Sequence, residues 1–325
     1  MRSICTALWH SLAHNPAIPL AHMITAVHPR WDEWAMACHA GDVAKLETLD
    51  TSDVFRHMDP FAMALLMDGA LQHGHPHVVD WLLGFADMDR FGGFACRVGS
   101  VALAKYVHAK GASGFNDSAF ACVCSRGHLH VAQWLRAEFQ LDKASEWPQM
   151  EVRALMGACD EGHLAVLQWL WSFSTLDPRR ELCRGFMGPV TFTDRGVPLF
   201  KSLISVACRR GHLHIAQWLH RQGALDIVGI ELVPTYSNSV FTETCGVGCL
   251  RVAQWLFGLG VIDLHCHEDA PFRWACSEDQ DRVAKWLLSL DPEYTAWPEE
   301  ALRQLQYQCW TPERDVWMRS IAQRS

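Results

Sequence analysis

A block of thirteen residues recurs along the chain and restricts it to a small set of folds. Its clearest copies read ACRRGHLHIAQWL, VCSRGHLHVAQWL and ACDEGHLAVLQWL, and they begin at Ala207, Val123 and Ala158. Aligned on a central glycine or its equivalent, successive copies lie 25 to 49 residues apart, with several steps close to 33. A period near 33 with two apolar segments in each unit is typical of stacked helix pairs. The copies are centred at Gly41, Gly74, Gly99, Gly127, Gly162, Gly211, Gly248 and Asp279.

Each unit is expected to contain two helices joined by a tight turn. The segments Pro198–Arg209 and Pro148–Asp160 precede a repeat glycine and open with proline, which suits a first helical position because its missing N–H would be unpaired there. Glycine then ends this helix in a left-handed conformation. After it, apolar residues such as Trp134 and Leu135 fall on one face of a short second helix. Because one such pair cannot bury both its faces alone, we predict an all-α helical-repeat solenoid of about eight pairs.

The same block resembles the ankyrin repeat. In that family the first helix ends in Ala-Ala-x-x-Gly-His and the second contains x-x-Val-Val-x-Leu-Leu-Leu, which Ala207–His212 and Ile215–Leu219 match. The likeness covers roughly residues 30–290, and its Trp-Leu variant is most similar to ankyrin proteins of large DNA viruses and oomycetes. The resemblance implies a scaffold for protein–protein interaction. The Thr-Pro-Leu-His helix opening is almost absent and several connections have unusual lengths, which affects the expected loops and not the stacked helices.

The domain organisation follows from this array. We predict an N-terminal helical cap over 1–29, the array over 30–290 and a C-terminal helical cap over 291–325. With 50% hydrophobic residues spread along a repeating core, one elongated domain is expected and not two globules. The step of 49 residues between the fifth and sixth copies holds an insertion around 174–197, either a docking loop or a tolerated insertion. Ile18–Ile24 faintly resembles an F-box, so the alternative function is a substrate-recruiting adaptor of a ubiquitin ligase.

Composition excludes several partners. Lys and Arg number 28 against 36 Asp and Glu, a net charge of -8, which argues against a nucleic-acid partner because that would require a clustered basic face. No apolar run approaches the ~18 residues that a membrane span needs. No nucleophile elbow, phosphate loop, dinucleotide fingerprint or His-Glu-x-x-His helix is present, so no enzyme activity and no cofactor are predicted. We interpret the pair Gly92-Gly93 as a helix end or turn.

Seven of the thirteen cysteines share one position, three residues before the repeat glycine. Packed helices lie ~8–10 Å apart, whereas a disulfide needs Cα atoms within about 7 Å. Zinc ligands must all lie ~2.3 Å from one ion, which one cysteine per layer cannot achieve. We therefore predict small buried thiols and no metal, and reduced thiols in such number favour the cytoplasm or nucleus, of a host cell if the chain is viral. The seven are Cys38, Cys96, Cys124, Cys159, Cys208, Cys245 and Cys276.

Histidine pairs also follow the repeat. His75 and His77, His128 and His130, and His212 and His214 each come directly after a repeat glycine. In the resembled family the first histidine bonds to the backbone of its own turn, so a structural role is favoured over metal binding. The run 265–269 (His-Cys-His-Glu-Asp) falls outside the register in a predicted loop. A solvated loop is favoured there over a chelating site.

Tryptophans recur seven residues after the glycine. A row of rings can stack nucleic-acid bases, but that mode needs a positive groove beside the rings, and the neighbouring residues here are Gln and Leu. Packing between units is therefore the favoured interpretation. The residues are Trp81, Trp134, Trp169, Trp218, Trp255 and Trp286, with Tyr106 in the third unit.

The two residues before each repeat glycine, the variable pairs, change freely against this frame. If the first helices line the inner surface, as in the resembled family, the variable pairs display a charge pattern that selects a protein partner. The alternative is an ordinary solvated helix end. Because the rest of the chain is net acidic, exposed arginines here would favour a partner with an acidic surface. The candidate contact residues, including two in the insertion, are Arg97, Arg126, Asp160, Glu161, Arg179, Arg180, Arg209 and Arg210.

Overall fold

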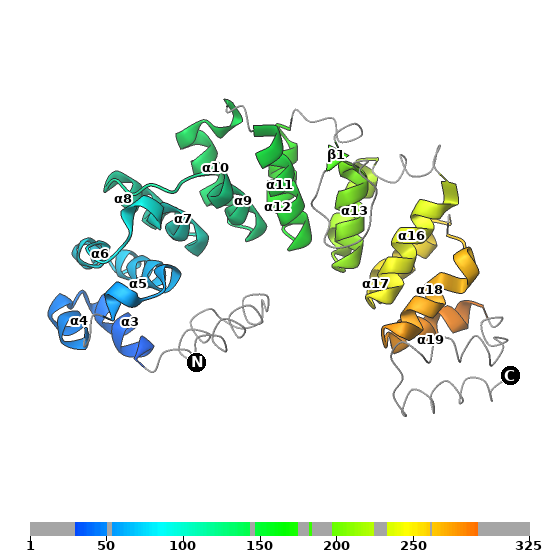
Figure 1. Cartoon of the computed structure of the whole chain (residues 1–325), viewed down its shortest axis with the longest axis horizontal. Helices are drawn as coiled ribbons and strands as arrows, with labels where there is room; N and C mark the ends of the chain where they lie inside the picture. The colour runs from blue at the N-terminus through cyan, green and yellow to red at the C-terminus, as the bar shows by residue number, and fades with distance from the viewer. Residues whose placement is uncertain are drawn as a thin grey trace. The chain divides into compact units, whose positions relative to one another are not determined.

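The computed structural model describes residues 30–50, 54–143, 147–174, 182–183, 197–223, 233–260 and 262–291. Over these ranges the chain is built from short helices in tandem, as the repeat pattern predicts (Figure 1). The contacts divide the chain into two compact units, 1–150 and 151–325, with the division inside α11 (Trp147–Asp160). The sequence predicted one elongated domain. The prediction and the observed division differ because each helix pair in a repeat protein contacts mainly its nearest neighbours. A division by contacts can therefore separate such a chain into two units.

Several predicted features lie outside the described residues. They include the N-terminal cap 1–29 with its F-box-like segment Ile18–Ile24, and the C-terminal cap beyond Asp291. Most of the insertion, including Arg179 and Arg180, also lies outside them.

The first unit consists of helix pairs stacked in chain order. The first helices α3, α5, α7 and α9 pack one against the next, and each second helix packs on its own first helix. The helices of this unit therefore form two layers, with α3, α5, α7 and α9 in one and α4, α6, α8 and α10 in the other (Figure 1). The elements are α3 Trp31–Ala40, α4 Val43–Leu49, η1 Phe55–His57, α5 Pro60–Gln72, α6 Pro76–Leu83, α7 Met88–Val98, α8 Val101–Ala109, α9 Asp117–Ser125, α10 Leu129–Phe139 and η2 Leu141–Lys143.

The second unit repeats this arrangement with longer connections. Here α13, α16 and α18 pack in succession, and α14, α17 and α19 pack on them in turn. Cys159 in α11 joins neighbouring pairs, because its thiol donates to the carbonyl of Leu203 in α13 at 3.1 Å. The elements after α11 are α12 Leu164–Trp171, β1 Leu182–Cys183, β2 Val197–Pro198, α13 Leu199–Arg209, α14 Leu213–Arg221, α16 Val233–Gly246, α17 Leu250–Gly258, α18 Cys266–Ser277 and α19 Asp281–Leu290.

A short antiparallel strand pair interrupts the helices of the second unit. Leu182 pairs with Pro198 and Cys183 with Val197, so two positions near the ends of the predicted insertion lie side by side. Pro198 was expected to open a helix, but it belongs to β2, and α13 begins one residue later. Both positions suit proline, which lacks an N–H and is tolerated at a strand edge as well as at a helix start.

The turn between the two helices is built alike in successive copies. In the fourth, the N–H of Gly127 donates to the carbonyl of Cys124, and the next N–H, of His128, donates to Val123, both at 3.1 Å. These two bonds close the helix end around a residue in the left-handed conformation. Asp279, which replaces glycine in the last copy, also adopts this conformation, with a φ of 59°.

The histidines that follow the repeat glycines form hydrogen bonds to the backbone of the preceding helix pair. This corrects the expectation that they bond to the backbone of their own turn. His128 donates from Nε2 to the carbonyl of Arg97 at 3.2 Å, and His212 donates to that of Asp160 at 2.8 Å. The second histidine behaves alike, since Nε2 of His214 lies 3.1 Å from the carbonyl oxygen of Gly162. These bonds require stacked units, so no local pattern could reveal them.

Three of the repeat glycines, Gly41, Gly99 and Gly162, lie directly beneath a histidine of the next repeat, whereas Gly74 has open space at its Cβ position. A Cβ on Gly99 would lie 2.6 Å from Nδ1 of His128, and one on Gly41 would lie 2.6 Å from Nδ1 of His75. Cys249 and Gln280 take the place of the histidine over Gly211 and Gly248. At these covered positions glycine is therefore required for two reasons: the left-handed backbone and the side chain of the next repeat.

The repeated aromatic residues pack between neighbouring helix pairs, and their side chains are half-buried. Ring centroids of Trp218 and Trp171 are 5.4 Å apart, and those of Trp134 and Phe115 are 5.6 Å apart. Tyr106, which replaces tryptophan in the third repeat, donates its hydroxyl hydrogen to Asp80 at 2.8 Å.

Gly92 and Gly93 lie inside α7, and not at a helix end or turn as the sequence suggested. The connection after α8 returns to this helix, where the N–H of Ser113 donates to Met88 and the carbonyl of Ser113 accepts from Gly92, both at 2.8 Å. A regular helix would pair Met88 and Gly92 with each other. A Cβ on Gly92 would lie 2.5 Å from the Ser113 oxygen, so only glycine allows this approach.

We expect Gly99→Ala to destabilise the protein more than Gly111→Ala. Both glycines have a left-handed φ, of 88° and 89°, so both substitutions lose roughly 1–2 kcal/mol through backbone strain. Gly111 has open space at its Cβ position, whereas Gly99 faces the ring of His128, which adds an overpacking loss of about 1–3 kcal/mol. Urea unfolding followed by circular dichroism measures both losses. Equal losses would contradict the role given to the His128 contact.

Candidate functional site

The variable pairs lie at the carboxyl ends of the first helices, and some of their side chains contact those of the next repeat. His39 and His73 stack, with ring centroids 4.2 Å apart and planes 21° apart. Burial and the neighbouring His73 lower the pKa of His39. Some neighbouring variable pairs are thus in direct contact. The positions are 39–40, 72–73, 97–98, 125–126, 160–161, 209–210, 246–247 and 277–278.

In the first unit, two arginines of the variable pairs share one aromatic ring. The guanidinium carbons of Arg97 and Arg126 lie 5.4 and 5.5 Å from the ring centroid of Phe61. Arg97 also lies 5.7 Å from the ring of Phe94. Such cation–π contacts contribute about 0.5–2 kcal/mol each and hold the guanidinium groups in place. Within the described ranges neither arginine forms an ion pair, and Nε of Arg97 is buried without a hydrogen-bond acceptor.

In the second unit the arginines face carboxylates of neighbouring helices. Arg210 donates from Nε and from a terminal nitrogen to the two oxygens of Asp160, both at 2.7 Å. This bond raises the pKa of the Arg210 guanidinium. Arg209 lies 3.7 Å from Glu243, whose pKa is raised by burial and partly restored by the arginine. The predicted contacts Asp160, Arg209 and Arg210 are therefore already engaged with their neighbours. Glu161 is exposed, and its charge also raises the pKa of Arg210.

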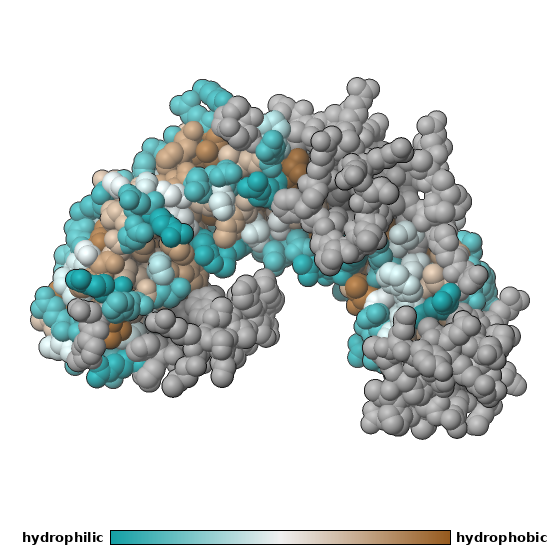
Figure 2. Space-filling model, in the orientation of Figure 1, coloured by the Kyte–Doolittle hydropathy of each residue, from teal (hydrophilic) through white to brown (hydrophobic). Residues whose placement is uncertain are grey.

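The variable pair Gly246-Val247 of the second unit is apolar, whereas the last pair, Ser277-Glu278, is polar. Val247 is exposed, and the exposed ring of Trp274 lies against Gly246, where a Cβ would approach it to 3.1 Å. Elsewhere on the face seen in Figure 2, apolar and hydrophilic residues are interspersed over the first unit. Charge and shape thus vary along the variable pairs within each unit.

The seven cysteines of the repeat are all buried, and none of them forms a disulfide. Burial raises the pKa of the Cys38 and Cys96 thiols to about 12, and it raises that of Cys208 further. The neutral thiol therefore persists at physiological pH. No group of three His, Cys, Asp or Glu residues among the described part of the chain is arranged to hold a metal ion.

The segment 265–269 was expected in a loop, but α18 begins at Cys266 and includes most of it. His265 precedes the helix and bonds to two carboxylates, with Nδ1 2.6 Å from Asp269 and Nε2 2.9 Å from Asp291. These two bonds raise its pKa, Asp291 having the larger effect. A histidine held between two aspartates ties the start of α18 to the end of α19, which gives it a structural role.

Sequence reasoning missed Phe61, the ring that positions Arg97 and Arg126. It lies in the first turn of α5, where Asp59 caps the helix by accepting from the N–H groups of Phe61 and Ala62 at 3.0 and 3.1 Å. The Asp-Pro-Phe sequence indicates a helix start, but nothing in it indicates a shared cation site. That site exists only where three successive first helices meet.

No protein-family model matches the chain, and no curated protein matches it either. Of the helices described, none has the length and apolar character needed to cross a bilayer.

We expect native thiol labelling to leave the seven repeat cysteines unmodified. They are buried and protonated, whereas Cys122 and Cys249 are half-buried and serve as internal references. Mass spectrometry after timed exposure to iodoacetamide should therefore detect Cys122 and Cys249 first, and the seven only in denaturant. Rapid native modification of Cys208, or a stoichiometric zinc ion lost in Cys208→Ala, would overturn this assignment.

The paired His265 should make stability depend on pH. Its folded-state pKa is raised above the ordinary value of about 6.5. Its stabilisation is therefore fully present below pH ~6.5 and is lost as the pH rises through the folded-state pKa. Urea midpoints for wild type and His265→Asn should differ most on the acidic side of that pKa and converge above it. His57→Asn, at an exposed histidine outside any ion pair of the described chain, should keep the wild-type pH profile.

Proposed function

We propose that the chain is an ankyrin-type repeat protein that acts as a non-catalytic scaffold and binds a protein partner through its variable pairs. The tandem helix pairs, the left-handed turn and the regular cysteine and tryptophan positions support the ankyrin-type assignment. One observation carries the functional part. Arg97 and Arg126 are held on Phe61 with no carboxylate opposite them in the described chain.

The chemistry of that site indicates the partner. Two guanidinium groups beside one ring repel each other, so a carboxylate from outside would relieve the repulsion and complete their hydrogen bonds. An acidic protein surface supplies such groups, and charge complementarity gives specificity and rapid association. The described repeat thiols are buried and form no disulfides, which favours a reducing compartment, so we assign the protein to the cytosol or nucleus.

Arginines of the second unit are less suitable for a direct test. Replacing Arg210 by glutamate would set a new carboxylate against Asp160, and the same change at Arg209 would face Glu243. Any lost binding could then reflect altered packing and not a lost contact. Within the described ranges Arg97 and Arg126 have no such carboxylate neighbour, so they are the sharper probes.

We expect Arg97→Gln/Arg126→Gln to weaken partner binding at least about tenfold, equivalent to ~1.4 kcal/mol, because two charge-assisted contacts are removed. Affinity capture with the tagged full-length chain would first identify partners, and binding would then be measured with purified proteins at two salt concentrations. The matched control is Lys45→Gln/Lys105→Gln, which removes the same charge from exposed positions on second helices. Circular dichroism would verify that each variant is folded.

Equal binding by both variants would place the interaction away from the variable pairs. The same capture tests the alternative function as a ubiquitin-ligase adaptor. Ligase components that depend on residues 1–29 for capture would favour that alternative.

A further inference from the structure

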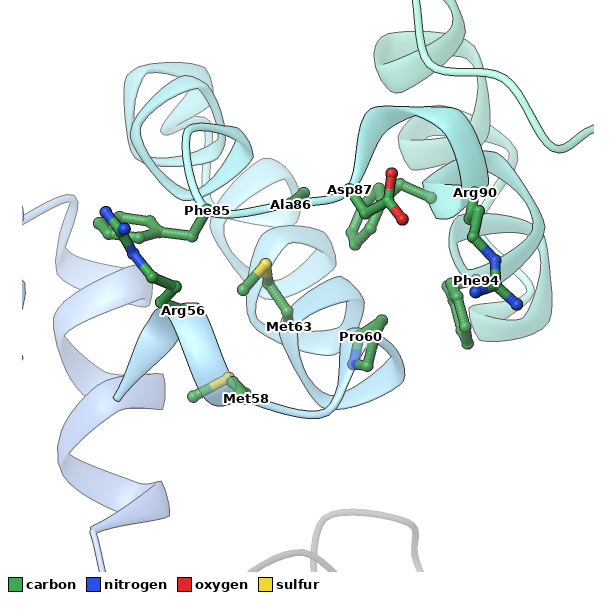
Figure 3. A pocket seen from close by; sticks show the side chains of 10 residues that line it. Arg56, Met58, Pro60, Met63, Phe85, Ala86, Asp87, Arg90 and Phe94 are labelled. Atoms are coloured by element: carbon green, nitrogen blue, oxygen red, sulfur yellow. The ribbon is translucent and has the colours of Figure 1, made fainter. Parts of the chain in front are cut away.

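A pocket of about 220 Å³ opens in the first unit, between the connections that lead into α5 and α7. Met63 and Phe91, which are buried, line it. The other lining residues come from η1, the segment that follows it, the connection 84–87 and the helices α5 and α7 (Figure 3). The apolar lining residues are Met58, Pro60, Met63, Phe85, Phe91 and Phe94.

Two exposed arginines flank this apolar pocket. In Figure 3 the side chain of Arg56 lies beside Phe85 at one side, and Arg90 lies beside Phe94 at the other. Neither arginine forms an ion pair within the described part of the chain. Asp87, the carboxylate that lines the pocket, is occupied as the N-cap of α7 and accepts from the N–H of Asp89 at 3.3 Å.

The pocket is continuous with the cation site described above. Phe94 lines the pocket and also lies beneath Arg97, which shares Phe61 with Arg126. Arg56 and Arg90 therefore line the pocket itself, and Arg97 and Arg126 are connected to it through the rings of Phe94 and Phe61. None of these four arginines has a carboxylate partner within the described chain, in a protein whose net charge is -8. Such local concentration of positive charge attracts an anionic ligand.

The size of the pocket distinguishes between kinds of anionic ligand. Small-molecule sites usually measure about 300–1,000 Å³, so 220 Å³ is small for a cofactor or metabolite. It suits one large apolar side chain, which is the usual anchor of a docked peptide. The surrounding arginines then match carboxylates on either side of that anchor.

We propose that this pocket binds a short acidic peptide segment of the partner through a single Leu, Met or Phe side chain, with flanking Asp or Glu residues paired to Arg56 and Arg90. The inference rests on the proposed interaction function and names the chemistry of its partner. Arg97 and Arg126, each a member of a variable pair, contact further acidic residues of the same partner beyond the pocket.

The test is selection of a displayed library of short random peptides on the full-length protein, followed by fluorescence polarisation with the selected peptides. Enriched peptides should carry one large apolar residue between acidic residues. Arg56→Gln/Arg90→Gln should weaken them at least about tenfold, and added salt should weaken them further. Ala86→Phe, which places a ring in the pocket, should do the same without changing charge. Lys45→Gln/Lys105→Gln should bind like wild type, and circular dichroism would verify the fold of each variant.

The inference is overturned if no acidic peptide is selected, or if selected peptides bind Ala86→Phe as well as wild type. Displacement of the peptide by octanoate at similar concentration would assign the pocket to a small carboxylate instead. If a captured partner still depends on Arg97 and Arg126 but not on Arg56, Arg90 or Ala86, the pocket assignment fails while the interaction function stands.

Discussion

The left-handed turn between the two helices of a pair is the constraint on which the rest of the structure depends. It reverses the chain in a few residues and leaves a glycine without side-chain cover, as at Gly99. The next unit supplies that cover with His128, whose ring nitrogen also satisfies the Arg97 carbonyl at the helix end. A turn such as the one at Gly99 is therefore complete only when the next helix pair is stacked on it, which links local backbone geometry to the stacking of helix pairs.

This dependence explains how variable residues are tolerated at the same helix ends. The backbone bonds of the turn and the contact of the next repeat's side chain with the repeat glycine do not involve the side chains of the variable pairs. Arg210 can therefore bond to Asp160 in one unit, while Arg97 and Arg126 rest on Phe61 in the other. A constant frame with changeable ends is a suitable basis for selecting protein partners, because recognition can change without loss of packing.

The difference between the two sets of arginines has a consequence for binding. A guanidinium that already bonds bidentately to a carboxylate must lose that interaction before it can contact a partner. One that rests on an aromatic ring keeps its outer N–H groups available while its position is held. The apolar pocket beside this second set adds a non-polar contact to a charged one, a combination that gives both affinity and orientation.

Much of the fold could be predicted from sequence, whereas the site could be predicted only in part. The all-α architecture was confirmed, and the predicted first helices agree with α11 and α13 to within a residue. Asp279 was recognised as a glycine equivalent and adopts the same backbone conformation. The variable pairs were recognised as candidates, but which of their charges are paired, and the presence of Phe61 beneath two of them, could not be foreseen.

The sequence by itself determined where the repeat turns fall and, to within a residue, where helices such as α11 and α13 begin and end, because caps, left-handed turns and apolar periodicity act over a few residues. Tertiary structure alone decided the bonds of His128 and His212, the entry of Ser113 into α7 and the pocket beside Phe94. Each of these joins residues more than one helix apart. Their contacts depend on how helices stack and where connections return, and local sequence patterns do not specify those distances.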